Sequence, residues 1–584
     1  MENALILVEP SEISAAGRLE KVLAVFGVAC CQMTVPEFLA AAGADDDQLQ
    51  SRLLCTSAAF LKLAEAFGQD SGAGSRWRRA VHSAFVFPGG DLVSLEELAK
   101  LITGDANASL AQISQGAVWD VSDQVPDFCK SMSGVRVTAT NDAGIALVFD
   151  AAKSNAAKII TTENGAAFVR LEFQSAPVFL STVGIVDVDA PLPARVFDIR
   201  PHFLAAVPVV LYVKWAFAGR CWEAPEVNAC LVIDDPLLQP TYGYVNYAEF
   251  LSLMLRHSFS TNIAFIPWNW ARSRSEVVRL FRENPEKFSL SVHGCDHTDG
   301  EFGHREKSWL TRRATQAIER MERHAAGTGI VHDLVMVLPQ GIFTDDAPGI
   351  LKQNGFMAIV NSEVFTTDPQ PRPIKISSVW DVAVMDYDCF PIYTRRCPTE
   401  GVENFAFDIL LGKPCIALIH HEFCRDGCAQ LVKAINQLNA LNCQLNWRSL
   451  GDVVRRGFRQ RLLPSGAVAV EMYGSELRLE NSSPQPQRFM VSKRETEPSL
   501  IKEILLENRP VVWKKSDGRV DFEVELGPGW SQVASIKFHA LAECRPVADG
   551  VYYRLKAGLR RHLCELRDNY VTKIRFAIRP PVTG

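Results

Sequence analysis

The sequence predicts an α/β protein built around a distorted (β/α) barrel, with an α/β plus β-rich region before the barrel and a β-sandwich-like region after it. Two observations carry this prediction. From about residue 229 to residue 441, short apolar runs alternate with amphipathic stretches of helical period, which is typical of parallel strands covered by helices. From about residue 135 to 188, and again after about residue 463, short apolar runs are separated by turn residues such as Gly, Pro, Ser and Asn, which predicts β-rich segments.

Length and composition indicate several folded parts. The chain has 584 residues, more than one hydrophobic core usually serves, and its 47% hydrophobic and 22% charged residues are close to the globular average. We expect four regions: an α/β domain at 1–134, a β-rich segment with an apolar helix at 135–222, the barrel at 223–462 and a β-rich accessory domain at 463–584.

The barrel section yields six strands and six helices. The predicted strands are 229–233, 262–266, 288–292, 334–338, 357–360 and 415–419. The predicted helices are 247–257, 275–283, 309–326, 347–354, 402–411 and 429–441. In such a barrel the functional side chains lie at the carboxyl ends of the strands.

The flanking regions have their own patterns. The first alternates apolar runs (4–8, 53–56, 84–88) with helical stretches, and shorter runs at 146–149, 158–161, 167–173 and 178–180 predict strands. Residues 203–218 predict a buried helix or an interfacial segment, because Pro208 and Lys214 interrupt a run that is too short to span a bilayer. Beyond residue 463 we expect strands at 467–472, 476–479, 487–491, 511–514 and 521–526, and then a basic helix at 555–566.

Charge and cysteine content narrow the classes of function. The chain carries 61 Lys and Arg against 67 Asp and Glu, a net charge of −6, and no long basic run interleaved with aromatics, which argues against nucleic acid as a partner. The first residues do not show the pattern of a secretory signal, and no stretch predicts a transmembrane segment. We therefore expect a cytoplasmic protein. Its 15 cysteines are expected to be free thiols.

Three predicted strands end in residues that bind metals or transfer protons. They lead into Asp234-Asp235, into His293 and His297, and into His420-His421. Each motif alone has an ordinary structural explanation, but a parallel barrel brings all three to one rim. Two imidazoles four residues apart, on one face of a helical turn, can bind one cation together with a carboxylate and leave a coordination position for water.

These segments, in this order, resemble the motifs of the polysaccharide deacetylase family, the carbohydrate esterases that include chitin and peptidoglycan deacetylases. The likeness covers about residues 226–460. It implies that Asp234 is the general base, that Asp235, His293 and His297 hold a divalent metal, and that His420 is the general acid.

The chain also departs from the family pattern. Pro236 follows the aspartates where the family has Gly, and no Arg stands in the third motif, here the sequence Val-Leu-Pro-Gln-Gly at 337–341. We therefore expect a divergent member, with Pro339 and Gly341 near the substrate and a backbone N–H in the stretch Gln340 to Gly341 facing the reaction. Pro236 predicts an extended backbone at Asp235. His421 competes with His420 for the acid role, since strand alternation points the two side chains to opposite faces.

Two further pairs could contact a substrate. Trp268 and Trp270 follow the second barrel strand and could stack on a sugar ring, although burial of large aromatics is the commoner reason for such residues. Arg395 and Arg396 could hold an anionic group, although two adjacent arginines usually form a solvated face.

The residues themselves predict metal-assisted hydrolysis. The resemblance implies its substrate, an N-acetylated amino sugar of a polysaccharide or glycan precursor, as in exopolysaccharide biosynthesis. Zinc is the first choice for two nitrogens and one carboxylate, with cobalt, nickel or iron compatible. Two alternatives stay open: a non-catalytic glycan-binding or scaffold protein that retains the barrel, and an iron oxygenase, which the tight His pair on a β/α scaffold disfavours. The oligomeric state is open.

Overall fold

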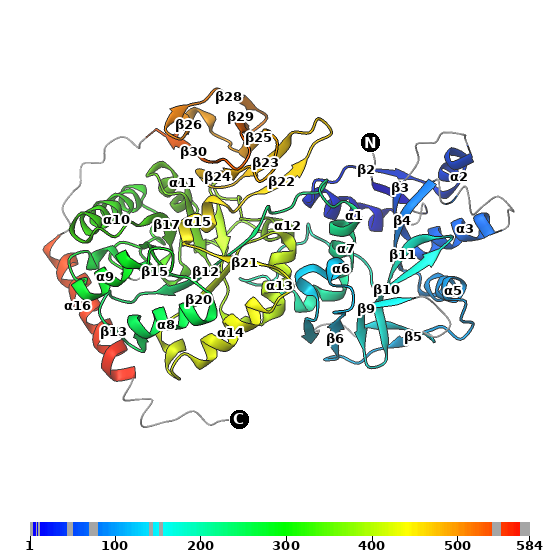
Figure 1. Cartoon of the computed structure of the whole chain (residues 1–584), viewed down its shortest axis with the longest axis horizontal. Helices are drawn as coiled ribbons and strands as arrows, with labels where there is room; N and C mark the ends of the chain where they lie inside the picture. Colours follow the sequence, from blue (N-terminus) through cyan, green and yellow to red (C-terminus); the bar gives the residue numbers. More distant parts are fainter. Residues whose placement is uncertain are drawn as a thin grey trace.

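A computed structural model describes residues 4–7, 9, 12–43, 51–68, 77, 80–138, 144–150, 156–298, 300–539 and 550–572. Figure 1 shows the amino-terminal region at one end of the long axis and the barrel at the other, with the carboxyl-terminal sheets packed beside the barrel. Among the described helices, none combines the length and the apolar character needed to cross a membrane.

The amino-terminal region is built on one mixed sheet of eleven strands. Its central path runs β2-β1-β3-β4-β11-β10-β9-β6-β7, with β5 and β8 attached beside it. The strands β1 to β4 are parallel and are connected by helices, whereas most pairs among β5 to β11 are antiparallel. The predicted boundary at residue 134 falls inside this sheet, between β6 and β7, and the domain limits stay a prediction.

The bounds of these elements are as follows. The strands are β1 (Ala4–Leu7), β2 (Cys30–Met33), β3 (Ser51–Thr56), β4 (Val81–Phe87), β5 (Ser109–Gln112), β6 (Val118–Val121), β7 (Arg136–Thr138), β8 (Ile145–Val148), β9 (Ala157–Thr162), β10 (Gly165–Phe173) and β11 (Ala176–Ser181). The helices are α1 (Ile13–Val25), α2 (Val35–Gly43), α3 (Ser57–Gly68), α5 (Leu92–Thr103) and α6 (Pro126–Cys129).

A buried helix joins this sheet to the barrel. Helix α7 (Phe203–Ala216) is apolar around its circumference and belongs to the same hydrophobic cluster as both regions. The Tyr212 hydroxyl lies 2.9 Å from the Ser83 hydroxyl of β4, and the buried Lys214 ammonium donates to the carbonyl of Trp222 over 2.7 Å. Of the two predictions for this segment, the buried helix is therefore confirmed.

The barrel is a parallel sheet that nearly closes on itself. The strands run in the order β19-β18-β17-β16-β15-β12-β20, and β21 pairs beside β12. Arg396, just after β19, pairs in parallel with Ala417 of β20, because its N–H donates to Ile416 and its carbonyl accepts from Leu418. All carboxyl ends of the strands therefore meet at one rim.

The predicted barrel elements lie within two residues of the observed ones. The strands are β12 (Val227–Asp234), β15 (Thr261–Phe265), β16 (Phe288–His293), β17 (Asp333–Val337), β18 (Ala358–Asn361), β19 (Ile392–Thr394), β20 (Cys415–Ile419) and β21 (Leu445–Trp447). The helices are α8 (Tyr247–His257), α9 (Ser275–Glu283), α10 (Lys307–Thr328), α11 (Asp346–Gln353), α12 (Ile376–Trp380), α13 (Val402–Leu411), α14 (Ala429–Asn439) and α15 (Leu450–Arg455). The sequence pattern does not predict β19, a strand of three residues that is too short for a periodic signal.

Within its described residues, the carboxyl-terminal region contains two sheets and one α-helix. One sheet has the order β22-β23-β25-β29-β28 and the other β24-β30-β26-β27, and both contribute to one hydrophobic cluster. The strands are β22 (Arg459–Leu462), β23 (Val468–Met472), β24 (Glu476–Glu480), β25 (Gln487–Arg494), β26 (Ile501–Leu506), β27 (Arg509–Pro510), β28 (Trp513–Ser516), β29 (Arg519–Leu526) and β30 (Ser531–Phe538). A sandwich-like arrangement stays a prediction for these sheets. The predicted basic helix is confirmed as α16 (Val551–Leu566), which lies at the outer edge of the barrel (Figure 1).

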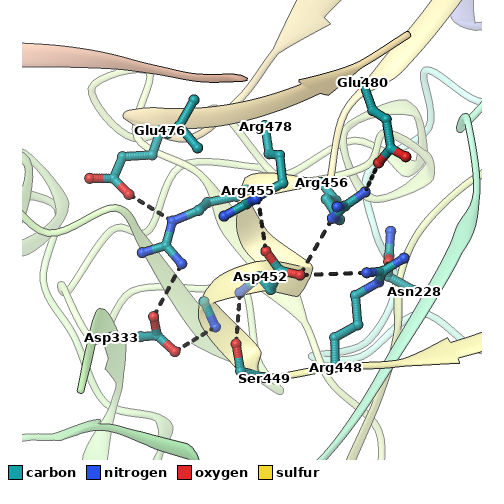
Figure 2. Close-up of polar contacts among 12 residues, drawn as sticks. Asn228, Asp333, Arg448, Ser449, Asp452, Arg455, Arg456, Glu476, Arg478 and Glu480 are labelled. Atoms are coloured by element: carbon teal, nitrogen blue, oxygen red, sulfur yellow. Dashed lines mark hydrogen bonds and ion pairs between the residues drawn. The ribbon is translucent and has the colours of Figure 1, made fainter. Parts of the chain in front are cut away.

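Helix α15 links the barrel to these sheets through a network of ion pairs (Figure 2). The Ser449 hydroxyl accepts the N–H of Asp452 and so caps the start of the helix. Asp333 of β17 accepts from the Gly451 N–H at 3.0 Å and from Arg455, which also binds Glu476 of β24. Parallel contacts join Asp452 to Arg478 and Arg456 to Glu480.

This network requires glycine at position 451. A Cβ atom there would lie 1.9 Å from an Asp333 carboxylate oxygen, so Gly451→Ala must displace the carboxylate from its N–H and from Arg455. We expect a loss of about 1 to 3 kcal/mol and a lower melting temperature by calorimetry. Gly327→Ala in α10 is the control, because nothing lies within 4 Å of its Cβ position. Equal melting temperatures for the two variants would contradict this account.

Candidate metal centre

Three side chains converge at the rim of the barrel where β12 and β16 end. One ligand atom each from Asp235, His293 and His297 lies within 4.8 Å of the others. The Asp235 Oδ1 atom is 3.5 Å from His293 Nε2 and 3.1 Å from His297 Nε2. The structure therefore brings together the three residues that the sequence proposes as metal ligands.

The environment of His293 fits a cation. Its Nδ1 atom lies 2.9 Å from the Val337 carbonyl, which can only accept, so Nδ1 carries a proton and Nε2 faces Asp235. The Oδ1 atom of Asp235 is buried and finds no hydrogen-bond partner among the described residues. Burial lowers the pKa of His293, but Asp234 and Asp235 raise it above its usual value overall. A positive charge between Nε2 and Oδ1, a proton or a metal ion, therefore balances the site.

His297 offers its other face to a basic side chain. Burial, with the nearby His293 and Arg561, lowers the pKa of His297 to about 4, so this imidazole is neutral at pH 7, as a metal ligand must be. An Arg561 nitrogen of α16 lies 3.3 Å from its Nδ1 atom and donates to it. Binding of a cation at Nε2 places the ring proton on Nδ1, so Arg561 must then turn away.

The loop geometry corrects two predictions. Asp235 has φ +82° rather than an extended backbone, because proline disfavours the right-handed helical region of the preceding residue and Asp tolerates the left-handed one. His293 and His297 do not share a helical turn, since His293 ends β16 and His297 has φ +53° in the following loop. The buried Glu301 carboxylate shapes this loop by accepting the N–H groups of Cys295, Asp296 and His297.

Asp234 forms a buried ion pair with Arg395. Two guanidinium nitrogens each donate to one carboxylate oxygen over 2.7 Å. Burial raises the pKa of Asp234, but Arg395 and the nearby histidines outweigh it and hold the pKa below its usual value. The prediction of a solvated arginine face is wrong: both arginines are 4% exposed, and Arg396 pairs with Asp408. Because Arg395 directly follows the missed strand β19, strand-end reasoning would have found it.

The structure separates His420 from His421. His420 is exposed and lines the same cavity as the metal-binding candidates. His421 is buried between the rings of Tyr242 and Tyr244, at centroid distances of 5.9 and 6.1 Å, with its Nε2 atom 3.6 Å from Asp568. Of the two candidate acids, only His420 faces the site.

The cavity, which we call the site cavity, has a volume of about 420 Å³. Its lining joins the rim of the barrel to one face of α16 and comprises Asp234, Asp235, Tyr242, His293, His297, Gln340, Gly341, Asn361, Ser362, Glu363, Arg395, Leu418, His420, Arg560, Arg561, Cys564, Arg567 and Asp568. The sequence did not predict that α16 lines this cavity, because a helical period shows which face of a helix is apolar but not which residues that face contacts.

The predicted substrate contacts fall in different places. Gly341 lines the site cavity, but its N–H donates to the Leu338 carbonyl and so is not free to face a reaction. Pro339 is buried beside Gly294. Trp268 packs against His562 of α16, and Trp270 lies at the surface beside Arg323. The structure does not bring either tryptophan into the cavity.

Comparisons with known proteins give distant structural similarities. No family model and no curated sequence matches the chain. A family 4 carbohydrate esterase from Streptomyces lividans is 13% identical over 36% of this chain and 85% of its own, with a TM-score of 0.22. A peptidoglycan N-acetylglucosamine deacetylase, Bc1960, is 15% identical over 40% of this chain and 90% of its own, with a TM-score of 0.25. A 4-alpha-glucanotransferase from Thermococcus litoralis is 10% identical over 39% of this chain and 40% of its own, with a TM-score of 0.27. At these identities and TM-scores, family membership stays a prediction, and the functional argument rests on the geometry of the site.

The site geometry predicts cation binding. We expect the chain to bind Zn²⁺ in titration calorimetry, and His297→Ala to bind it about 100-fold more weakly or worse, since loss of a direct ligand should cost at least as much as loss of an outer partner. His257→Ala, which changes a half-buried histidine that contacts Asn436 away from the site cavity, should bind like the parent. Arg561→Ala should bind at least as tightly, because it removes a positive charge that contacts His297. Equal affinities of the parent and His297→Ala would contradict this assignment.

Proposed function

We propose that this protein is a metal-dependent hydrolase that removes N-acetyl groups from amino sugars of a polysaccharide or glycan precursor. One observation carries the proposal: three side chains with the geometry of metal ligands, a buried charged aspartate and an exposed histidine line the same cavity. These are the groups that metal-assisted amide hydrolysis needs, and the resemblance of the motifs supports the sugar as the substrate class.

Three side chains would hold the metal ion that provides positive charge for the reaction. Asp235, His293 and His297 would hold a divalent ion, zinc by preference for this set of ligands. Such an ion lowers the pKa of water and polarises an amide carbonyl. Asp235 stays ionised for this role, because His293, His297 and Arg561 hold its pKa well below the usual range despite burial.

Asp234 and His420 would move the protons. Asp234 is kept as a carboxylate by Arg395, so it is ready to accept a proton from the attacking water. His420 lines the cavity and would donate a proton to the leaving amine. The products are acetate and a free amino sugar. A cavity of about 420 Å³ lies within the range of small-ligand sites.

A second candidate function is binding of glycans without catalysis. Two contacts favour it: both oxygens of Asp234 are engaged by Arg395, and Arg561 occupies the side of His297 that must carry a proton when a metal binds. In a catalyst Arg561 must leave His297 when the metal binds, and Asp234 must accept a proton on a lone pair that Arg395 leaves free. Stoichiometric zinc together with no acetate release from any acetylated glycan would establish this second function.

Asp234→Asn tests the base. The substitution removes the proton acceptor but none of the three proposed metal ligands. We expect full metal content by elemental analysis and a loss of acetate release from N-acetylglucosamine oligomers of about 10²-fold to 10⁴-fold. The parent protein measured beside it provides the reference for both quantities. Retention of full activity would remove Asp234 from the role of base.

His420→Ala tests the acid, with His421→Ala as its neighbour control. Loss of the exposed histidine should lower the rate of acetate release by about 10²-fold to 10⁴-fold at unchanged metal content. The buried His421 packs between two tyrosines, so its loss should lower stability more than the rate per folded molecule. The opposite ranking of the two rates would mean that His421 is the acid.

A further inference from the structure

Helix α16 and the turn that follows it, η10 (Arg567–Val571), present an apolar surface to solvent. Of the 20 exposed large hydrophobic side chains among the described residues, eight lie between Val551 and Val571. Six of them form a row along one face, which we call the apolar stripe: Tyr552 (81% exposed), Leu555 (68%), Leu559 (63%), Leu563 (55%), Leu566 (52%) and Tyr570 (63%). Such a concentration marks an interaction surface.

The opposite face of α16 fixes the helix on the barrel. The Tyr553 hydroxyl donates to Asp296 over 3.0 Å, and the Tyr242 hydroxyl donates to Asp568 over 2.7 Å. Arg272 forms a bidentate ion pair with Glu565. Figure 1 shows the helix at the outer edge of the barrel. Because polar contacts hold the inner face, the apolar stripe is fixed outward.

Charge distinguishes α16 from the rest of the chain. Residues 551–571 contain five Lys and Arg and two acidic residues, a net charge of +3 (5 − 2), whereas the whole chain carries −6. Lys556, Arg560 and Arg567 follow one edge of the apolar stripe, four and seven residues apart; Lys556 and Arg567 are exposed and Arg560 is half-buried, and Arg567 also binds Asp568 through its Nε atom. An apolar row beside basic side chains is the pattern of a helix that lies in the interface of a membrane.

We propose that the apolar stripe docks on the surface of an anionic lipid bilayer. The leucines would enter the boundary of the acyl chains, and Lys556, Arg560 and Arg567 would contact lipid phosphates. Tyr552 and Tyr570, at the two ends of the stripe, are side chains that favour the interface. This surface stands independently of the proposed hydrolysis.

The spacing argues against a second copy of the chain as the occupant. From Tyr552 to Leu566 the stripe advances by 3, 4, 4 and 3 residues, and it ends in η10, which is a π-helical segment. It therefore keeps neither the alternation of 3 and 4 residues nor the unbroken α-helix of a coiled coil. A heptad that begins at Tyr552 and Leu555 would place His562 and Asn569 in the seam. Two copies of the helix would also bring their positive charges together.

Docking would set the site cavity beside the lipid headgroups. Arg560 and Arg567 line the cavity and also border the apolar stripe, so one helix serves both surfaces. A substrate anchored in the same bilayer would thereby reach the cavity without leaving the membrane surface.

Sedimentation of the full chain with vesicles tests the proposal. We expect roughly tenfold or more protein bound to vesicles of phosphatidylcholine with one quarter phosphatidylglycerol than to phosphatidylcholine alone, with less bound at high salt. L559E and L563E should abolish binding, since a charge enters the acyl boundary. Val512→Glu is the matched control, an 86% exposed apolar residue outside α16, and should bind like the parent.

Three results would overturn the proposal: no binding to either vesicle, equal binding to both, or a lipid-free dimer in analytical ultracentrifugation that L559E dissociates. Both leucines are exposed, and unchanged circular dichroism and zinc affinity will show that the variants are folded. The vesicle assay uses no substrate, so absence of vesicle binding would not contradict the proposed hydrolysis. Absence of acetate release would likewise not contradict the docking surface.

Discussion

Two adjacent aspartates at the end of β12 impose the constraint on which the site depends. Asp234 is buried and Asp235 is partly buried with its Oδ1 atom out of contact with solvent, so each of the two negative charges needs a positive partner. Arg395 compensates Asp234 through two hydrogen bonds, whereas Asp235 leaves one oxygen without a hydrogen-bond partner, facing two imidazoles. A divalent cation completes the balance, and the near-closure of the barrel at Arg396 holds Arg395 where it meets Asp234.

The barrel could be predicted from sequence because its signals are local. Strand and helix periods indicate six strands and six helices, and the rule that function lies at strand ends assigns Asp235, His293 and His297 to one rim, where the structure places them. The failures have physical causes. The three residues of β19 are too few to show a strand period, so the prediction of a solvated Arg395 is wrong. The left-handed backbone at His297 lies in a loop held by Glu301, whose carboxylate accepts three N–H groups from distinct loop residues, and the sequence pattern does not show this contact.

Contacts between segments that are far apart in the chain could not be predicted from the sequence. Helix α16 is predictable as a basic helix, yet its period could not show that Arg561 reaches His297 or that Asp568 reaches Tyr242, 326 positions away. The same helix explains why Trp268 does not line the site cavity, since Trp268 packs against His562. One helix from the end of the described chain thus closes the site cavity and carries the apolar stripe on its other face.

The most direct test of the cation-binding account is a crystal structure of the zinc-loaded chain with anomalous scattering recorded at the zinc edge. The account predicts one strong anomalous peak bonded to Asp235, His293 and His297, with Arg561 displaced from His297. A peak at the neighbouring group of Cys295, Asp296 and Glu301, which also brings three ligand atoms within 4.8 Å, would contradict it. No peak at saturating zinc would do so equally.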